Sequence, residues 1–487
     1  MNKTGCIVWI VILVTFCTVG CFGGGTDSDP MANAGLDQDV TRGATVTLDG
    51  NGSSDAETYS WSLISRPTGS SAVLSDSTVA DPSFVADIAG IYQSSLVVSD
   101  GTTDSGPDTV TINTTVTRDQ SIAFLGNGPY AVGSTNFEHS DTQVEAILAL
   151  DRDVGMYWTG DHSTGEQLYV TSLLANPSDA FTFNVAVPDD STLYGAEAGN
   201  TIPYAGIIYY PTSAANARSD YALPGGDTLP KMQGPGEDPI FAASTAKYPL
   251  IVNSHGKWSY PLDPFNADLV EKIASYGSIV VSLFHGDRRF PDFGVDLDLR
   301  EAQEFALRPL AVKTVLDVLE TDPDFSQHID FDKIGGVGNS YGGATLLASM
   351  GGRIIGPTFA GTRETTIDTR IKAAVGIVPY IGEPLFGLQN VGVPDVSTPY
   401  LAIAGESDTV APLSNTKDAL REMQGVKYLV GIEGEEHAFS ENARQDAATW
   451  AIKFLQSYVE GNTATLLELQ TVQSVEGGAV DQFVSLA

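Results

Sequence analysis

Apolar residues follow two different patterns along the chain, and the first pattern extends over residues 30–118. Short stretches there alternate between apolar and polar positions, as in residues 45–48, and Tyr59, Trp61 and Leu63 recur at every second position. Alternation at period two turns one face of a strand toward a core and the other toward solvent. Turn-forming Asp-Gly pairs follow two of these stretches. The segment therefore predicts a small all-β unit built as a sandwich.

Residues 119–460 show the second pattern, in which short continuous apolar runs alternate with segments at helical spacing. Parallel strands that are covered on both faces read as continuous apolar runs. This alternation predicts an α/β unit with a mostly parallel sheet between layers of helices. The predicted strands are 182–187, 205–211, 248–252, 278–284, 333–337, 373–378, 400–404 and 427–432, and the predicted helices are 269–276, 307–319, 342–347 and 447–458.

The length and composition of the chain agree with this division. A chain of 487 residues is too long for one ordinary domain, so two or three are expected. The apolar content of 42% is sufficient for packed cores. Residues 461–487 have no clear period, and we treat them as a C-terminal tail without a predicted fold.

Charge and cysteine content limit the partners and the chemistry. The formal net charge of −36 would repel a phosphate backbone, which excludes nucleic acid as a partner. All three cysteines, Cys6, Cys17 and Cys21, precede the predicted folded units, so these units can form no disulfide. The sequence does not indicate an oligomeric state.

The first residues predict an export signal. Lys3 supplies a positive charge, residues 6–14 form a short apolar core, and small residues follow as far as Gly20. The apolar run is too short to span a bilayer as a stable anchor. We therefore expect residues 1–20 to be a signal peptide and the protein to be exported.

Cys21 directly follows the small residue Gly20. This arrangement resembles the lipobox of bacterial lipoproteins, although Thr18 stands where leucine is usual. The resemblance implies that Cys21 is lipidated and attaches the protein to a membrane. The alternative is ordinary signal-peptidase cleavage near the same place, which would give an extracellular protein. Residues 21–29, rich in Gly, Ser and Asp, would form a flexible tether.

A candidate nucleophile lies in residues 338–342, which read Gly-Asn-Ser-Tyr-Gly. The motif stands where the predicted strand 333–337 meets the predicted helix 342–347. A turn this sharp pushes the serine hydroxyl outward, and backbone atoms approach so closely that side chains at the glycine positions would collide. Ser340 is therefore the candidate nucleophile, and an inert serine in a glycine-rich turn is the alternative.

A candidate acid follows the serine along the chain. Asp408 comes directly after a late predicted strand, where a carboxylate can hold an imidazole in the tautomer that general-base catalysis needs. Glu406 is a competing acid nearby and Asp395 a more distant one. A solvated loop aspartate without a catalytic role is the alternative interpretation.

The candidate base is His437, which follows the last predicted strand of the α/β unit. Of six histidines it is the only one that comes after both Ser340 and Asp408. The chain order Ser, Asp, His is one of the known orders of a catalytic triad. Glu435 and Glu436 beside it are expected to face solvent.

An oxyanion would need two backbone amide donors. One candidate is the amide of Tyr341, next to the nucleophile, and the other is that of Lys257, in the loop after the predicted strand 248–252. Trp258 and His285 are candidates for contact with a substrate. His255 precedes the serine in the chain and is expected to be structural.

Four short motifs in the front unit resemble those of PKD-type immunoglobulin-like modules of secreted bacterial proteins. The resemblance implies an immunoglobulin-like sandwich that acts as a spacer or weak binding module without catalysis, and leaves a calcium or glycan site open. The motifs are Ala32-Asn33-Ala34-Gly35, Leu48-Asp49-Gly50, Tyr59-Ser60-Trp61-Ser62 and Val97-Val98-Ser99-Asp100-Gly101.

The second unit resembles α/β-hydrolases of the dienelactone hydrolase and platelet-activating-factor acetylhydrolase type, and its first strands resemble those of cutinase-like polyester hydrolases. The resemblance implies an α/β-hydrolase fold and a serine esterase that needs neither metal nor cofactor. Asn339 departs from the family, where histidine or tryptophan is common. So does the polar stretch 212–247, which we expect to be an irregular loop near the site. The segments that carry the resemblance are 248–289, 331–347, 399–412 and 428–439.

These features favour an exported carboxylic-ester hydrolase that acts on a small-molecule or polymeric ester. A peptidase or amidase on the same fold is one alternative. A non-enzymatic surface binding protein with a relic hydrolase fold is another, and it predicts the loss of at least one triad residue. Ser340, Asp408 and His437 are all present.

Overall fold

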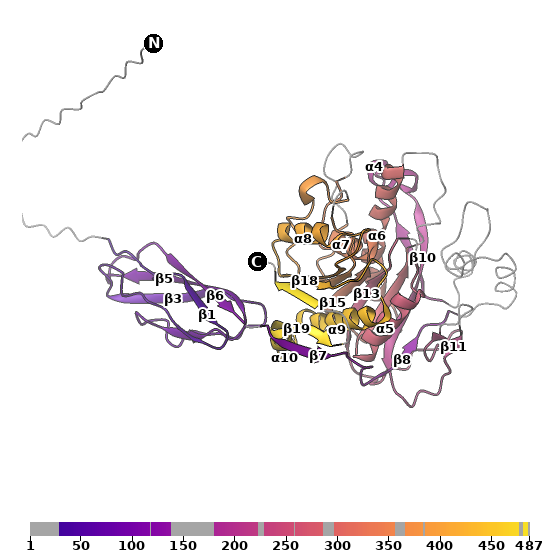
Figure 1. The fold of residues 1–487 in the computed structure, drawn as a ribbon, viewed down its shortest axis with the longest axis horizontal. Coiled ribbons are helices and arrows are strands. Elements are labelled where there is room, and N and C mark those ends of the chain that lie inside the picture. Colours follow the sequence, from indigo (N-terminus) through magenta and orange to yellow (C-terminus); the bar gives the residue numbers. More distant parts are fainter. Residues whose placement is uncertain are drawn as a thin grey trace, which may run out of the picture. The chain divides into compact units, whose positions relative to one another are not determined.

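The computed structural model describes residues 29–116, 118–137, 180–222, 228–257, 259–285, 297–355, 366–382, 385–476 and 481–485. The chain divides into two compact units, Met1–Thr115 and Val116–Ala487 (Figure 1). The predicted signal peptide, Cys21 and all of the predicted tether but its last residue lie outside the described residues.

The first unit is a β-sandwich in which two sheets cover one core. The larger sheet has the order β1-β6-β5-β3, with β1 parallel to β6, and the smaller sheet pairs β2 with β4. Trp61 of β3 and Leu96 of β5 share a buried cluster with Val46 of β2 and Phe84 of β4. The apolar positions of the alternating pattern therefore form the inward face of these strands. The bounds are β1 Gln38–Thr41, β2 Thr45–Thr47, β3 Thr58–Ser65, β4 Ser83–Val85, β5 Gly90–Ser99 and β6 Asp108–Thr115.

The second unit is built on one mixed sheet, which in the described part has ten strands. Its order is β20-β18-β17-β16-β15-β13-β14-β10-β8, and β9 also pairs with β10. The run from β18 to β14 is parallel, whereas β20, β10, β8 and β9 pair antiparallel. The bounds are β8 Ala131–Ser134, β9 Thr182–Ala186, β10 Thr201–Thr212, β13 Tyr248–Ser254, β14 Ile279–Phe284, β15 Ile329–Asn339, β16 Ile371–Ile377, β17 Tyr400–Gly405, β18 Lys427–Ile432 and β20 Asp481–Ser485.

Helices cover both faces of this sheet (Figure 1). Leu250 of β13 belongs to the core beneath α6, α7 and α8, whereas its neighbour Ile251 belongs to the core beneath α5 and α9. Both faces of the strands are thus buried, which explains their continuous apolar runs. The helix bounds are α4 Ser191–Tyr194, α5 Pro264–Ser275, α6 Leu297–Leu319, α7 Tyr341–Ser349, α8 Leu413–Glu422, α9 Glu441–Tyr458 and α10 Thr463–Thr471, with 3-10 turns at Gly195–Glu197 and Leu388–Asn390.

The predicted strands and helices are present, but several helices begin earlier than predicted, and helix α8 was not predicted. Helix α5 begins at Pro264, directly after Asp263, whose side chain accepts a hydrogen bond from the Phe265 amide. A proline at the first helical position and an acidic cap are ordinary start signals. The prediction began at residue 269 because it followed only the apolar spacing.

The stretch 212–247 does not lie where the sequence analysis expected it. Strand β10 is antiparallel to β14, with Ala205 opposite Phe284 and Tyr209 opposite Val280. The end of β10 and the start of β13 therefore lie at the amino ends of the parallel strands. The expected position beside the catalytic motif, which follows the carboxyl end of β15, is wrong. Two short strands in this stretch, β11 Tyr221–Ala222 and β12 Thr228–Leu229, pair with each other.

The segment after Glu460, for which the sequence predicted no fold, forms part of the second unit. Helix α10 is followed by β19, Val472–Glu476, which pairs in parallel with β7, Gln120–Ala123. Strand β20 then extends the main sheet beside β18. The side chain of Asp481 accepts hydrogen bonds from the Trp450 indole and the Val475 amide, both at short range (2.8 and 2.9 Å).

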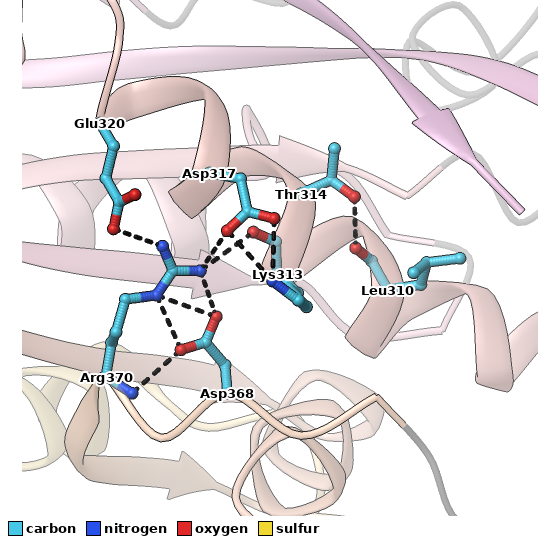
Figure 2. A network of polar contacts seen from close by, with 7 residues as sticks. All are labelled: Leu310, Lys313, Thr314, Asp317, Glu320, Asp368 and Arg370. Atoms are coloured by element: carbon cyan, nitrogen blue, oxygen red, sulfur yellow. Dashed lines mark hydrogen bonds and ion pairs between the residues drawn. The ribbon is translucent and has the colours of Figure 1, made fainter.

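A polar network joins the end of α6 to the start of β16 (Figure 2). Arg370 donates from Nε to Asp368 (2.9 Å), from Nη1 to Glu320 (2.6 Å) and from Nη2 to Asp317 (2.6 Å). Lys313 also donates to Asp317. Asp368 is buried, with 5% of its surface exposed. The guanidinium thus compensates a buried carboxylate and fixes the helix to the sheet.

We predict that Arg370→Gln lowers the free energy of unfolding by about 2–3 kcal/mol, because it leaves Asp368 buried without its cation. Urea unfolding of the full chain measures this. Arg421→Gln, which breaks the exposed pair with Asp418, is the matched control and should change stability by less than about 1 kcal/mol. Equal effects of the two substitutions would contradict the assignment of Arg370 as a structural tie.

Candidate active site

Ser340 stands on a strained turn between β15 and α7. Its backbone has φ 49° and ψ −113°, a left-handed conformation that non-glycine residues rarely adopt. A Cβ built on Gly342 would lie 1.7 Å from the carbonyl oxygen of Ser254, and one built on Gly338 would lie 2.4 Å from the carbonyl carbon of Gly342. Both flanking positions therefore require glycine, as the motif predicts.

Hydrogen bonds hold this turn from both sides. The Ser340 amide donates to the carbonyl of Ile377 at the end of β16 (2.8 Å). The Ser340 carbonyl accepts from the amides of Tyr380 and Gly343, each at 3.0 Å. The neighbouring strand and the helix thus fix the position of the serine.

The structure brings Ser340, Asp408 and His437 together. Nδ1 of His437 lies 2.7 Å from Oδ2 of Asp408, and Nε2 lies 3.0 Å from Oγ of Ser340. A proton on Nδ1 facing the carboxylate leaves Nε2 free to accept the serine proton. Of the competing acids, Asp395 pairs instead with Arg353, and Glu406 does not take the place of Asp408.

Asp408 is held in place by the loop after β17. Its Oδ1 accepts hydrogen bonds from the amides of Val410 and Ala411, both at 2.8 Å. The side chain is buried, whereas that of His437 keeps 26% of its surface exposed. The carboxylate therefore has one oxygen committed to the loop and the other to the imidazole. This arrangement suits an acid that orients a base.

The loop after β13 lies against the nucleophile. A Cβ built on Gly256 would be 3.5 Å from the Cβ of Ser340. Lys257 follows directly, and its Nζ lies 5.6 Å from the centre of the Tyr341 ring. Tyr341 is the first residue of α7, where the helix dipole is positive. The two residues predicted as oxyanion donors thus lie on the segments that flank Ser340.

A buried arginine that the sequence analysis did not single out supports this loop. Arg308 of α6 is 2% exposed and donates to the carbonyl oxygens of His255 (2.7 Å) and Gly256 (3.2 Å). Its guanidinium also lies 5.1 Å from the centre of the Tyr341 ring. The sequence offered one signal for this residue, which is that Arg308 is a charged residue within an apolar helical segment. Its partners are carbonyls, which no side-chain pattern reveals.

The two histidines near this loop are buried and hydrogen-bonded. His255 is buried; its Nδ1 lies 2.7 Å from the Gly256 carbonyl and its Nε2 accepts from the His285 amide. His285 is 2% exposed, and its Nε2 bonds with the hydroxyl of Ser254. The ring of His285 is enclosed in the described structure, and its predicted contact with substrate stays a prediction. Trp258, the other predicted substrate contact, lies outside the described residues.

The loop that carries His437 is closed by a carboxylate. Glu435 accepts from the amide of Ser440 (2.8 Å) and from its hydroxyl (2.7 Å), so it bridges the two ends of the loop. The carbonyl of Glu435 also accepts from the Ser407 amide (2.9 Å) in the loop of Asp408. Glu435 was expected to face solvent; instead it ties the two loops together. Glu436 is exposed, as expected.

Beneath this loop lies a buried pair of acids, Asp446 of α9 and Asp481 of β20. Asp446 is fully buried, and neither carboxylate oxygen has a hydrogen-bond partner in the described part of the chain. Burial is the largest cause that raises the pKa of Asp446, and the negative charges of Asp481 and Glu435 raise it further, to about 8. Burial also raises the pKa of Asp481. Asp446 is thus protonated at neutral pH in the folded chain.

A raised folded-state pKa makes stability depend on pH. The unfolded carboxyl releases its proton near pH 3.8, whereas Asp446 in the folded chain releases it only near 8. Its contribution to stability is therefore complete below pH 4 and is lost as the pH rises to 8. We predict that Asp446→Asn raises the free energy of unfolding by about 1–3 kcal/mol at pH 9 and changes it little at pH 4.

Urea unfolding at pH 4, 7 and 9 measures this difference. Asp418→Asn, at an exposed position of α8, is the matched control and should leave the pH dependence unchanged. A constant difference between Asp446→Asn and the parent chain at all three pH values would show that Asp446 does not titrate in this range.

Within the described residues, no group of three or more His, Cys, Asp or Glu side chains could hold a metal ion. The helices in the same part of the chain include none with the length and apolarity needed to cross a membrane.

Comparison with known proteins identifies the front unit. Residues 34–114 match the family model of a PKD domain. This range covers most of the β-sandwich, including the motifs at Leu48-Asp49-Gly50 and Val97-Val98-Ser99. The chain contains a PKD domain, and the predicted PKD resemblance of this segment is confirmed. No curated protein matches the chain.

Proposed function

We propose that the second unit is a serine carboxylic-ester hydrolase with an α/β-hydrolase fold. The observation that carries the proposal is the continuous hydrogen-bonded chain from Ser340 through His437 to Asp408. A nucleophile, a base and an orienting acid in this order are the working parts of acyl transfer by serine.

In the proposed reaction, Oγ of Ser340 attacks the ester carbonyl while Nε2 of His437 takes its proton. The negative oxygen of the tetrahedral intermediate accepts hydrogen bonds from the backbone amides of Tyr341 and Lys257. His437 then gives the proton to the leaving alcohol, and an acyl-enzyme forms on Ser340. His437 next takes a proton from water, whose oxygen attacks the acyl carbonyl. As the carboxylic acid leaves, His437 returns the proton to Oγ of Ser340. Asp408 keeps Nδ1–H oriented throughout.

The arrangement of the sheet supports this fold assignment. Ser340 follows β15 in the middle of the parallel run, and Asp408 and His437 follow β17 and β18 on one side of it. The carboxyl ends of parallel strands meet at one edge, which is where sites form in α/β proteins. A serine on a strained strand-to-helix turn, followed by Asp and then His, is typical of α/β-hydrolases.

An uncharged pocket lies next to the loop that carries Asp408. This cavity has a volume of about 230 Å³ and is lined by residues 379–382, by the loop after Asp408 and by the start of α8. Its other side chains include Thr409, Val410 and Asn415, and none of those that line it is charged. Placing a charged group there without a partner would be unfavourable. In this proposal, the pocket takes a small uncharged part of the ester.

The front of the chain fits an exported enzyme. In this proposal, residues 1–20 direct export, Cys21 is lipidated and anchors the chain to a bacterial membrane, and the PKD domain acts as a spacer. The absence of cysteine after Cys21 is compatible with an oxidising compartment.

We predict that a fluorophosphonate probe labels the full chain at Ser340 and that Ser340→Ala abolishes the labelling. The probe reacts only with a serine whose proton a neighbouring base can accept. Gel fluorescence followed by peptide mapping measures the result. Equal labelling of Ser340→Ala and the parent chain would reject the proposed nucleophile, and absence of labelling in both would reject a serine hydrolase.

The same preparation distinguishes esters from amides. Turnover of p-nitrophenyl butyrate without turnover of the matching anilide supports an esterase, whereas efficient cleavage of the anilide favours the peptidase or amidase alternative. Ser340→Ala serves as the background for both substrates.

We predict that Glu435→Ala lowers kcat for the ester by about tenfold to a hundredfold with little change in KM, because the loop of His437 loses its closure. Glu435→Gln should restore part of the rate, since its amide oxygen can still accept from the Ser440 amide. Glu436→Ala is the matched control and should leave kcat unchanged. An unaltered kcat in Glu435→Ala would show that the bridge does not position the base.

A further inference from the structure

A second cavity lies behind the loop of His437, between α5 and the start of α9. The two helices run side by side on one face of the sheet (Figure 1). The cavity has a volume of about 300 Å³, and its walls include Ile377 and Phe439. Ile377 accepts the hydrogen bond of the Ser340 amide, and Phe439 comes two residues after His437. The proposed reaction uses no side chain of this cavity.

A buried ammonium group lines this cavity. Lys272 of α5 is 9% exposed, and its Nζ donates to Oε1 of Gln445 on α9. No carboxylate of the described residues forms an ion pair with it. Burial lowers the pKa of Lys272, with the charge of Asp268 acting in the opposite direction. An ammonium group has three N–H donors, and the bond to Gln445 uses one of them, so the others can serve an anion.

A second cation lines the cavity beside the first. Nε of Arg444 donates to the carbonyl of Phe439 (3.1 Å), and its guanidinium lies 5.7 Å from the centre of the Phe265 ring. The ring contact and the hydrogen bond fix the plane of the guanidinium. Its remaining N–H groups suit a planar two-oxygen group such as a carboxylate.

The other charges of the cavity lie at its rim. Asp268 and Glu441 also line it, and both are exposed to solvent. Water screens these acids, whereas Lys272 is buried and Arg444 half-buried. The interior of the cavity is therefore positive relative to its mouth.

Apolar side chains form the rest of the walls. Phe265 and Leu269 contribute from α5, and Phe439 and Ala448 contribute from the region of α9. The lining thus combines apolar and aromatic side chains with polar and charged ones, which suits a small molecule that has an apolar body and a charged end. The walls would contact an apolar body and the cations its charged end.

We propose that this α5–α9 cavity binds a small carboxylic acid with an apolar or aromatic body, its carboxylate on Lys272 and Arg444. The proposal rests on the charges and walls of the cavity and not on the reaction proposed for Ser340. A ligand bound there contacts Phe439 and so lies directly behind the loop that positions His437.

Titration calorimetry of the full chain carrying Ser340→Ala tests the proposal, since this variant cannot turn over an ester. The probes are benzoate, benzamide and inorganic phosphate. Benzoate should bind at least about tenfold more tightly than benzamide, which lacks the charge, and than phosphate, which lacks the apolar body. Equal affinities for benzoate and benzamide, or no binding of benzoate, would overturn the proposal.

Substitutions locate the site. Lys272→Met should weaken benzoate binding by about tenfold or more, and Lys272→Arg should retain it. Lys372→Met, at an exposed position of β16, is the matched control and should bind as the parent does. Undiminished binding in a folded Lys272→Met chain would exclude this cavity. Probe labelling of Ser340 in the chain without these substitutions is independent of every outcome here.

Discussion

Backbone segments of β13, β15, β16 and α7 meet beneath Ser340 at distances that leave no room for a Cβ. Gly342 packs on the carbonyl of Ser254, Gly338 packs on Gly342, and the Ser340 amide bonds to the carbonyl of Ile377. These strands belong to the buried centre of the sheet. The candidate nucleophile is therefore fixed by closely packed backbone, and its strained conformation is maintained by that packing.

The base and the acid are placed differently, on two loops at the same edge of the sheet. The loops are joined to each other by the bond from the Ser407 amide to the Glu435 carbonyl, and the loop of His437 is closed by the side chain of Glu435. A shift of one loop therefore moves the other, which preserves the contact between Asp408 and His437. Arg308 gives the loop after β13 a comparable support from α6.

The sequence predicted the parts of this structure that depend on local pattern. Continuous apolar runs located the strands, and the glycines around Ser340 indicated a turn because their requirement arises within five consecutive residues. The position of residues 212–247 was missed because an apolar run does not show whether a strand is parallel or antiparallel to its neighbours. The partners of Arg308 are carbonyls brought close only by folding, and the enclosure of His285 likewise depends on tertiary contacts.

The pairing of β7 with β19 has a mechanical consequence. The chain enters the second unit through β7, and β7 is bonded in parallel to β19 and does not join the main sheet. A force that pulls the chain from its amino-terminal side would act along β7. The hydrogen bonds between β7 and β19 would resist this force together. The ladder would therefore bear tension from the leading segment before that tension reached the main sheet, which carries Ser340.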